Sequence, residues 1–257
     1  MQAFRYYDVI TSLSTGASPL QSLDRLHPLS LLPSGPSPLD NVDTLLGAAT
    51  DLWPILYRLC DLISLKRDLD QATASCQGSK VAVLRAEYEA TCAAINYALN
   101  KWEPCLKLCF DDDPTTEASK RSILGNALAY RHSALVYLHR TILERPREDE
   151  VVQRHVHMSL LQCLVVVASG GPVSALLWPL FVAACEAQTG VDRGLARQAF
   201  LAIESRQGMA NIEKARAVVM EVWRRVDLLV CDITTNGVSA NLWRVVAEET
   251  GLSLVLG

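Results

Sequence analysis

The chain has 257 residues, half of them hydrophobic, with a mean hydropathy of +0.16 and a net charge of −4. This length suffices for one sizeable core or for a core with a small appendage. The acidic balance argues against DNA binding as the main activity, because that affinity depends on clustered Lys and Arg side chains. The first residues lack the basic start and continuous apolar core of a signal peptide, so we expect no targeting segment there.

Helical periodicity dominates the sequence, and no alternating strand pattern is present, which predicts an all-α fold, an irregular multi-helix bundle. We expect a single helical domain over 1–257. In chain order, the predicted helices span about 4–13, 51–69, 80–100, 117–143, 148–168, 174–188, 192–206, 211–230 and 240–248.

Two of the predicted connections have distinctive compositions. A Pro/Ser-rich loop at about 15–43 contains prolines at 28, 33, 36 and 38, which exclude a continuous helix. After it, Thr50 or Asp51 is expected to cap the next helix, with Pro54 in the first turn, where its missing N–H costs nothing. Near the end of the chain, Asn236-Gly237 predicts a turn.

The block from Leu160 to Cys185 carries no charged residue, so a membrane span has to be considered. A span needs about 20 consecutive apolar residues. Gly170-Gly171-Pro172 divides the block into shorter pieces, and each piece suits a core helix better than a bilayer. We therefore predict no contact with a membrane.

Eight cysteines stand at 60, 76, 92, 105, 109, 163, 185 and 231. No Cys-x2-Cys pair is present, and Cys105 with Cys109 supplies two ligands where a tetrahedral zinc site needs four. Most of the cysteines fall on apolar helical faces, where a free thiol behaves as a small buried hydrophobe. We expect reduced, mostly buried thiols, no metal site and no cofactor.

Other possible metal ligands are also better explained without a metal. His155 and His157 are two residues apart and point in different directions on a helix. His132 and His139 are two turns apart and could share one face, although packed or surface histidines remain the favoured interpretation. Asp111–Asp113 lacks the ligand spacing of a calcium loop and precedes Pro114, so a solvated acidic turn is expected.

No motif for catalysis is present: the sequence has no nucleophile elbow, no phosphate-binding Gly-rich loop and no HExxH pair. The chain is therefore predicted not to be an enzyme. Basic residues at 214, 216, 224 and 225 alternate with Glu213 and Glu221, which indicates an ion-paired solvent face rather than a DNA-contact surface.

Large apolar side chains gather late in the sequence, on helices that must pack together. Core packing explains them most simply, and the alternative is an apolar pocket for a small hydrophobic ligand. The candidate pocket residues are Trp178, Phe181, Met209 and Trp223, and Trp243 belongs to the same group.

Several dispersed segments share one resemblance. They are Tyr6–Gly16, Asp51–Pro54, Ala129–Leu135, Leu177–Ala187 (which begins LWPLF), Arg206–Asn211 and Glu221–Arg225. Over about positions 4–230, the chain resembles the second type of fungal-specific transcription factor domain. This is the C-terminal regulatory domain of binuclear zinc-cluster regulators of the acriflavine-sensitivity and sterol-uptake kind.

The resemblance implies a helical regulatory domain of a nuclear transcription regulator. The six-cysteine zinc cluster and the early helices of that family are missing here, so we expect the later portion of the domain, without DNA contact of its own. In the branch that responds to sterols, the helical domain holds an apolar pocket, which implies a small hydrophobic effector.

We also expect a protein partner or a homo-oligomer, because missing helices would leave apolar faces to be covered. Two alternatives stay open. One is a truncated paralogue that acts only as a dimerisation or interaction module, and the weaker one is an enzyme with an apolar pocket.

Overall fold

A computed structural model describes residues 2–17, 19–20, 48–104, 114–230, 241–252, 254 and 256. Within these ranges every regular element is helical and none is a strand, which confirms the predicted all-α bundle. The elements are α1 (Gln2–Thr15), the 3-10 turn η2 (Thr50–Leu52), α2 (Trp53–Ala74), α3 (Gly78–Lys101), α4 (Pro114–Tyr137), the π-helical turn η3 (Leu138–Ile142), α5 (Glu150–Ala168), α6 (Leu177–Glu186), α7 (Gly190–Gln207), α8 (Ala210–Val230) and α9 (Leu242–Glu249).

Three predicted features fall on other parts of the chain. Most of the Pro/Ser-rich loop at 15–43 lies outside the described residues, and so do Asp111–Asp113 and the Asn236-Gly237 turn.

Local signals account for several helix ends. The Asp149 carboxylate caps α5 by accepting hydrogen bonds from the backbone N–H groups of Val151 at 2.8 Å and Val152 at 3.3 Å. At the C-terminal end of α7, Gly208 adopts φ +49°, the left-handed conformation that commonly ends a helix. The predicted cap of α2 was wrong in detail. Thr50 and Asp51 form η2, and Leu52 occupies the N-cap position without a side-chain cap.

The long helix predicted at 117–143 is continuous but changes its winding. It runs as α4 and then as η3, whose last carbonyl belongs to Ile142. That carbonyl accepts a hydrogen bond from the Tyr88 hydroxyl at 2.6 Å and another from Lys66 Nζ at 3.3 Å. Side chains of α2 and α3 thus donate to a carbonyl at the end of the π turn, where the helix itself supplies no backbone N–H partner.

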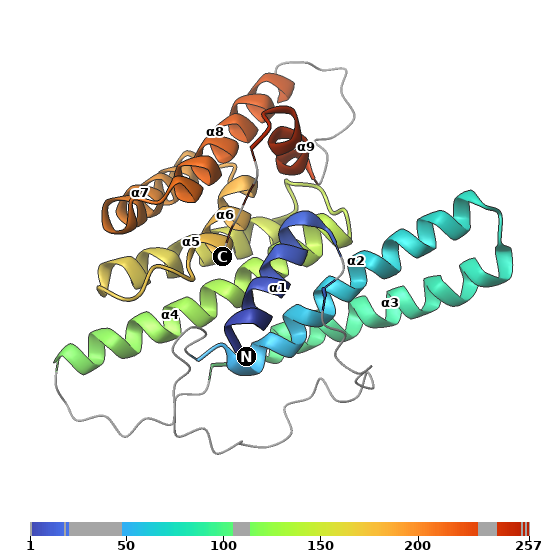
Figure 1. Ribbon diagram of the computed structural model, residues 1–257, viewed down its shortest axis with the longest axis horizontal. Helices are drawn as coiled ribbons and strands as arrows, with labels where there is room; N and C mark the ends of the chain where they lie inside the picture. The colour runs from blue at the N-terminus through green and yellow to red at the C-terminus, as the bar shows by residue number, and fades with distance from the viewer. Residues whose placement is uncertain are drawn as a thin grey trace.

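The helices form layers around α6 (Figure 1). α4 packs along α5, and α6 lies against both of them. α7 and α8 cover the opposite side, and α9 packs on α8. α2 and α3 form a hairpin that projects beyond the other helices, while α1 lies across the base of α2.

Among the described helices, one is long and apolar enough by length and composition to cross a membrane, namely α5. Core helices of soluble proteins have the same length and composition. In this fold α5 contacts α4, α6 and α7, as a core helix does.

The turn between α5 and α6 approaches α4 closely at Gly171. A Cβ atom added there would lie 2.5 Å from the Cβ atom of the buried Ser122. We expect Gly171→Ala to lower the free energy of unfolding by about 1–3 kcal/mol, because neither backbone can move freely inside the packed bundle. Urea unfolding followed by circular dichroism measures this change.

Gly194, inside α7, provides the matched control, because a Cβ atom there meets nothing within 4 Å. Gly194→Ala should stabilise the protein by about 0.4–1 kcal/mol, since alanine restricts the unfolded chain and favours the helix. Equal effects of the two substitutions would contradict the close approach at Gly171.

Candidate functional site

All ten residues of α6 are buried, from Leu177 to Glu186. The helix carries no charge before its last residue, and it contacts α4, α5, α7 and α8. A helix that is apolar all round belongs to the interior of a protein or to a membrane. Here it is the interior, and two of the four candidate pocket residues, Trp178 and Phe181, come from this helix.

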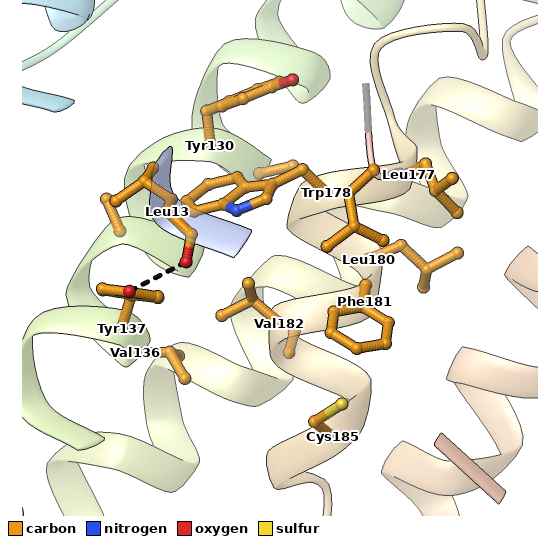
Figure 2. Close-up of a cluster of buried hydrophobic side chains, with 14 of the residues drawn as sticks. Leu13, Tyr130, Val136, Tyr137, Leu177, Trp178, Leu180, Phe181, Val182 and Cys185 are labelled. Atoms are coloured by element: carbon orange, nitrogen blue, oxygen red, sulfur yellow. Dashed lines mark hydrogen bonds between the residues drawn. The ribbon is translucent and has the colours of Figure 1, made fainter. Parts of the chain in front are cut away.

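The Trp178 side of α6 faces α4 (Figure 2). Its indole stacks on Tyr130 with ring centres 5.5 Å apart, and Tyr137 lies 6.5 Å away on the other side. The Tyr130 hydroxyl donates to the carbonyl of Ala175 at 2.6 Å, and the Tyr137 hydroxyl donates to that of Leu13 at 2.9 Å. Burial raises the pKa of Tyr137 to about 12 and that of Tyr130 well above its usual value, so both phenols act as neutral donors that fix these rings.

A row of aromatic rings extends from this point to the first helix. Trp53 of α2 packs edge-on to Tyr130 at 6.2 Å, and Tyr6 of α1 stacks on Trp53 at 5.4 Å. The hydroxyls of Tyr6 and Tyr130 are 3.1 Å apart. The row therefore joins α1, α2, α4 and α6 through rigid side chains.

Phe181 follows Trp178 by three residues and so lies on an adjoining face of α6, which faces α8 and α9. Phe181 packs edge-on to Trp243 of α9 with ring centres 5.4 Å apart. One turn along α6, the carbonyl of Ala184 accepts a hydrogen bond of 2.8 Å from the indole N–H of Trp223 in α8. These contacts place three tryptophans and a phenylalanine around one buried helix.

Met209 takes a different position from the other candidates. It precedes α8, directly after Gly208, and 43% of its surface is exposed. The structure thus brings Trp178, Phe181 and Trp223 together around α6 and leaves Met209 at the surface.

A cluster of three buried histidines was only partly predicted. His132 and His139 do share a face of the α4–η3 helix, because the ring of His155 from α5 stacks against both of them. The Nδ1 atoms of His132 and His155 are 3.0 Å apart, and the rings of His139 and His155 are parallel at 6.3 Å. The sequence offered no signal for the third member, because its partners lie in another helix.

Burial holds these imidazoles neutral. Desolvation first, and the charges of Arg131 and Arg154 second, lower the pKa of His132 to about 4. The same cause lowers the pKa of His139 to about 4 and that of His155 to about 3.

His157 points away from the histidine cluster, as its spacing from His155 predicted, and bonds to Asp192 of α7 at 2.7 Å. Across the part of the chain that the structure describes, no group of three His, Cys, Asp or Glu side chains is arranged to hold a metal ion.

Five cysteines lie in the described ranges, and all five have free thiols. Four are buried, as the sequence predicted, and Cys76 is exposed. Burial raises the pKa of the Cys163 thiol to about 12, which leaves it a neutral, unreactive group. The remaining positions, 105, 109 and 231, fall outside the description.

The last residue of α6 forms a buried ion cluster that sequence reasoning missed. The Glu186 carboxylate accepts from Arg140 Nε at 2.8 Å, and Arg147 Nε lies 3.4 Å from the same oxygen. Both arginines and the glutamate are almost fully buried. No local pattern indicates this cluster, because its members lie 39 and 46 residues from Glu186.

In a comparison with known families, one family model spans the whole chain. Residues 1–257 fit the model of the fungal specific transcription factor domain. The chain belongs to this family. No curated protein and no solved structure matches it in the same comparisons. Domains of this family belong to fungal transcription regulators and are not typically enzymes.

Proposed function

We propose that this fungal transcription factor domain is an effector-sensing regulatory domain. It would bind a small hydrophobic molecule beside α6 and act in the nucleus through a partner protein, without touching DNA itself. The observation that carries the proposal is the placement of α6, which is buried throughout and packs against aromatic rings on two adjoining faces. The net charge of −4 agrees with a role that does not rest on phosphate contacts.

The mechanism follows from two adjoining faces of α6. An apolar ligand near Phe181 and Trp223 would bind more tightly to one packing of the helices around α6 than to another. This difference in affinity would shift the population toward the packing that binds the ligand better. Trp178, three residues before Phe181 on the adjoining face of the helix, would carry the shift to Tyr130 and Tyr6 of the aromatic row. Met209 precedes α8 by one residue, roughly 20 Å along the helix from Trp223, so it would not line this site.

Ergosterol, delivered from cyclodextrin, is a suitable probe of the site. We expect it to change the tryptophan emission of the purified chain saturably and to raise Tm. Phe181→Leu keeps an apolar side chain but removes the edge-on ring contact with Trp243, and it should weaken binding by roughly tenfold, or about 1.4 kcal/mol.

Val191→Ala, at an exposed position of α7, is the control and should bind as the wild type does. A wild-type protein that shows no response would refute sensing of this molecule class. Fusing the chain to an unrelated DNA-binding domain, in front of a reporter gene, tests the regulatory role separately.

A pure interaction module is favoured by a different observation, on α3. One face of this helix is apolar and exposed at alternating spacings of three and four residues, which is the pattern of a helix that packs on another helix. Its members are Val83 (67% exposed), Ala86, Ala90, Ala93 and Tyr97 (56% exposed).

Sedimentation velocity separates this second function from the first. If the α3 face binds a second helix, the wild type should associate at micromolar concentration and Ala90→Glu should remain monomeric. A wild type that stays monomeric would count against self-association through this face.

A further inference from the structure

Helix α5 is more apolar than its packing in this fold requires. It is long and apolar enough to cross a membrane, yet only 39% of its most apolar stretch is buried. By comparison, every residue of the apolar helix α6 is buried. Apolar surface that a folded domain leaves open marks a place where another molecule packs.

The open side is one stripe along α5. Met158, Leu161, Val165 and Ala168 follow one another at spacings of three, four and three residues, so they share one face of the helix. Leu161 is 36% exposed, Val165 is 37% exposed, Ala168 is exposed and Met158 is half-buried. A stripe of this length extends for about 15 Å, which matches about three turns of a second helix.

Helix α4 borders the stripe. A Cβ atom added at Gly125 of α4 would lie 3.3 Å from Cγ1 of Val165, so the two helices touch there. Arg121 stands four residues before Gly125 and Leu128 three residues after it, on the same side of α4. The half-buried Leu128 extends the apolar surface, and the exposed Arg121 lies at its border.

The charged side chains around the stripe are arginines. Arg154 is exposed one turn before the stripe begins, and Arg206 of α7 donates to a carbonyl of the turn that follows α5. The one acidic residue of α5, Glu150, lies in its first turn, away from the stripe. No carboxylate of the described residues forms an ion pair with Arg121, Arg154 or Arg206. This surface is therefore locally basic in a chain whose net charge is −4.

We propose that the stripe and Leu128 form a docking surface for one amphipathic helix of a partner protein, whose apolar side is bordered by Asp and Glu. Spacings of three and four residues match the ridges with which helices pack on one another. Carboxylates at the border of the incoming helix would pair with Arg121, Arg154 and Arg206. A lipid surface fits less well, because Leu161 and Val165 are about one-third exposed and do not project as membrane-inserting side chains do.

The docking surface serves the partner interaction of the proposed function and rests on that function. It involves neither the effector site beside α6 nor the exposed face of α3. A peptide-binding measurement on the purified chain needs neither ergosterol nor a reporter gene, so failure of docking is distinguishable from failure of effector sensing.

The probe is a fluorescein-labelled peptide of three identical heptads, Leu-Glu-Ala-Leu-Glu-Ala-Glu, and its control carries lysine at every glutamate position. At pH 7.5 and low salt, we expect fluorescence anisotropy to show saturable binding of the acidic peptide, at least tenfold tighter than binding of the lysine peptide. Added salt should weaken the binding, because it screens the arginines. No binding of the acidic peptide, or equal binding of the two peptides, overturns the proposal.

Two substitutions on the surface locate the binding. Leu161→Glu places a charge on the stripe and should abolish binding of the acidic peptide, and Arg154→Glu reverses a border charge and should weaken it by roughly tenfold. Arg85→Glu, at an exposed position of the α2–α3 hairpin, is the matched control and should bind as the wild type does. Because Arg154 is exposed, its variant reports on binding even if Leu161→Glu does not fold. Unchanged binding in Arg154→Glu contradicts the proposal.

Other occupants of the surface give different results. Wild-type protein should not sediment with vesicles of phosphatidylcholine and phosphatidylserine. If it does, and Leu161→Glu abolishes this, the surface binds a membrane and the proposed helix is refuted. Self-association that Leu161→Glu abolishes would assign the surface to a second copy of the chain and refute it equally.

Discussion

Glu186→Gln is expected to lower the free energy of unfolding by about 3–5 kcal/mol, because it leaves two buried guanidinium groups without a counter-charge. The substitution preserves the shape of the side chain and a hydrogen-bond acceptor. Its effect therefore reports the lost charge rather than a cavity. The carboxylate is buried, and Arg140 and Arg147 both reach it, so solvent cannot replace it.

Chemical denaturation at pH 7.5 measures the effect of Glu186→Gln. Glu204→Gln is the matched control, since Glu204 lies 3.5 Å from the partly exposed Arg216. An exposed pair of this kind contributes about 0–1 kcal/mol. If both variants lose the same small amount of stability, the buried cluster is not the constraint inferred here.

Acidification from pH 7.5 to pH 5.5 is expected to cost about 4 kcal/mol of stability, because three histidines stay neutral in the fold while they become charged when unfolded. The pKa is about 4 for His132 and His139 and about 3 for His155, each lowered by burial. Unfolded histidine has a pKa near 6.5. At pH 5.5, each of these histidines therefore binds nearly one proton more in the unfolded chain than in the folded one.

The sign follows from proton binding. The unfolded chain binds more protons below pH 6.5, so stability is complete above that pH and falls as the pH approaches 4. Ordinary Asp and Glu side chains titrate below pH 5, outside this window.

Urea unfolding at the two pH values tests the effect of the histidines. His155→Leu removes one of three imidazoles and should reduce the loss by about a third, or ~1.4 kcal/mol. Val191→Ala, at an exposed position of α7 outside the cluster, should keep the full pH dependence. Equal wild-type stability at both pH values would show that the cluster is already protonated or open.

Much of the fold could be predicted because helix formation depends on neighbours within one or two turns. Apolar residues recur with the helical period. Asp149 begins α5 through hydrogen bonds to its first turn, and Gly208 ends α7 through its own left-handed dihedral angles. The limits of the later helices were correct to within a few residues for this reason. The cap of α2 was wrong because η2 uses the same residues in a tighter turn.

Of the candidate site, the sequence indicated which large apolar side chains matter but not how they meet. Trp178 and Phe181 are three residues apart, so their common helix was foreseeable. Their contacts with Tyr130 and Trp243 depend on α4 and α9, which are distant in the chain. Met209 carries the same apolar signal, yet the turn after Gly208 leaves it exposed.

By itself, the sequence determined the helical class, the positions of most helices, and the set of segments that led to the family. Only the tertiary structure decided which polar groups are buried together. His155 meets His132 across two helices, and Glu186 meets Arg140 across 46 residues. Helical periodicity predicts which side of a helix is apolar, but it does not predict which other helix packs against that side. The burial that shifts pKa values arises only when two such helices pack together.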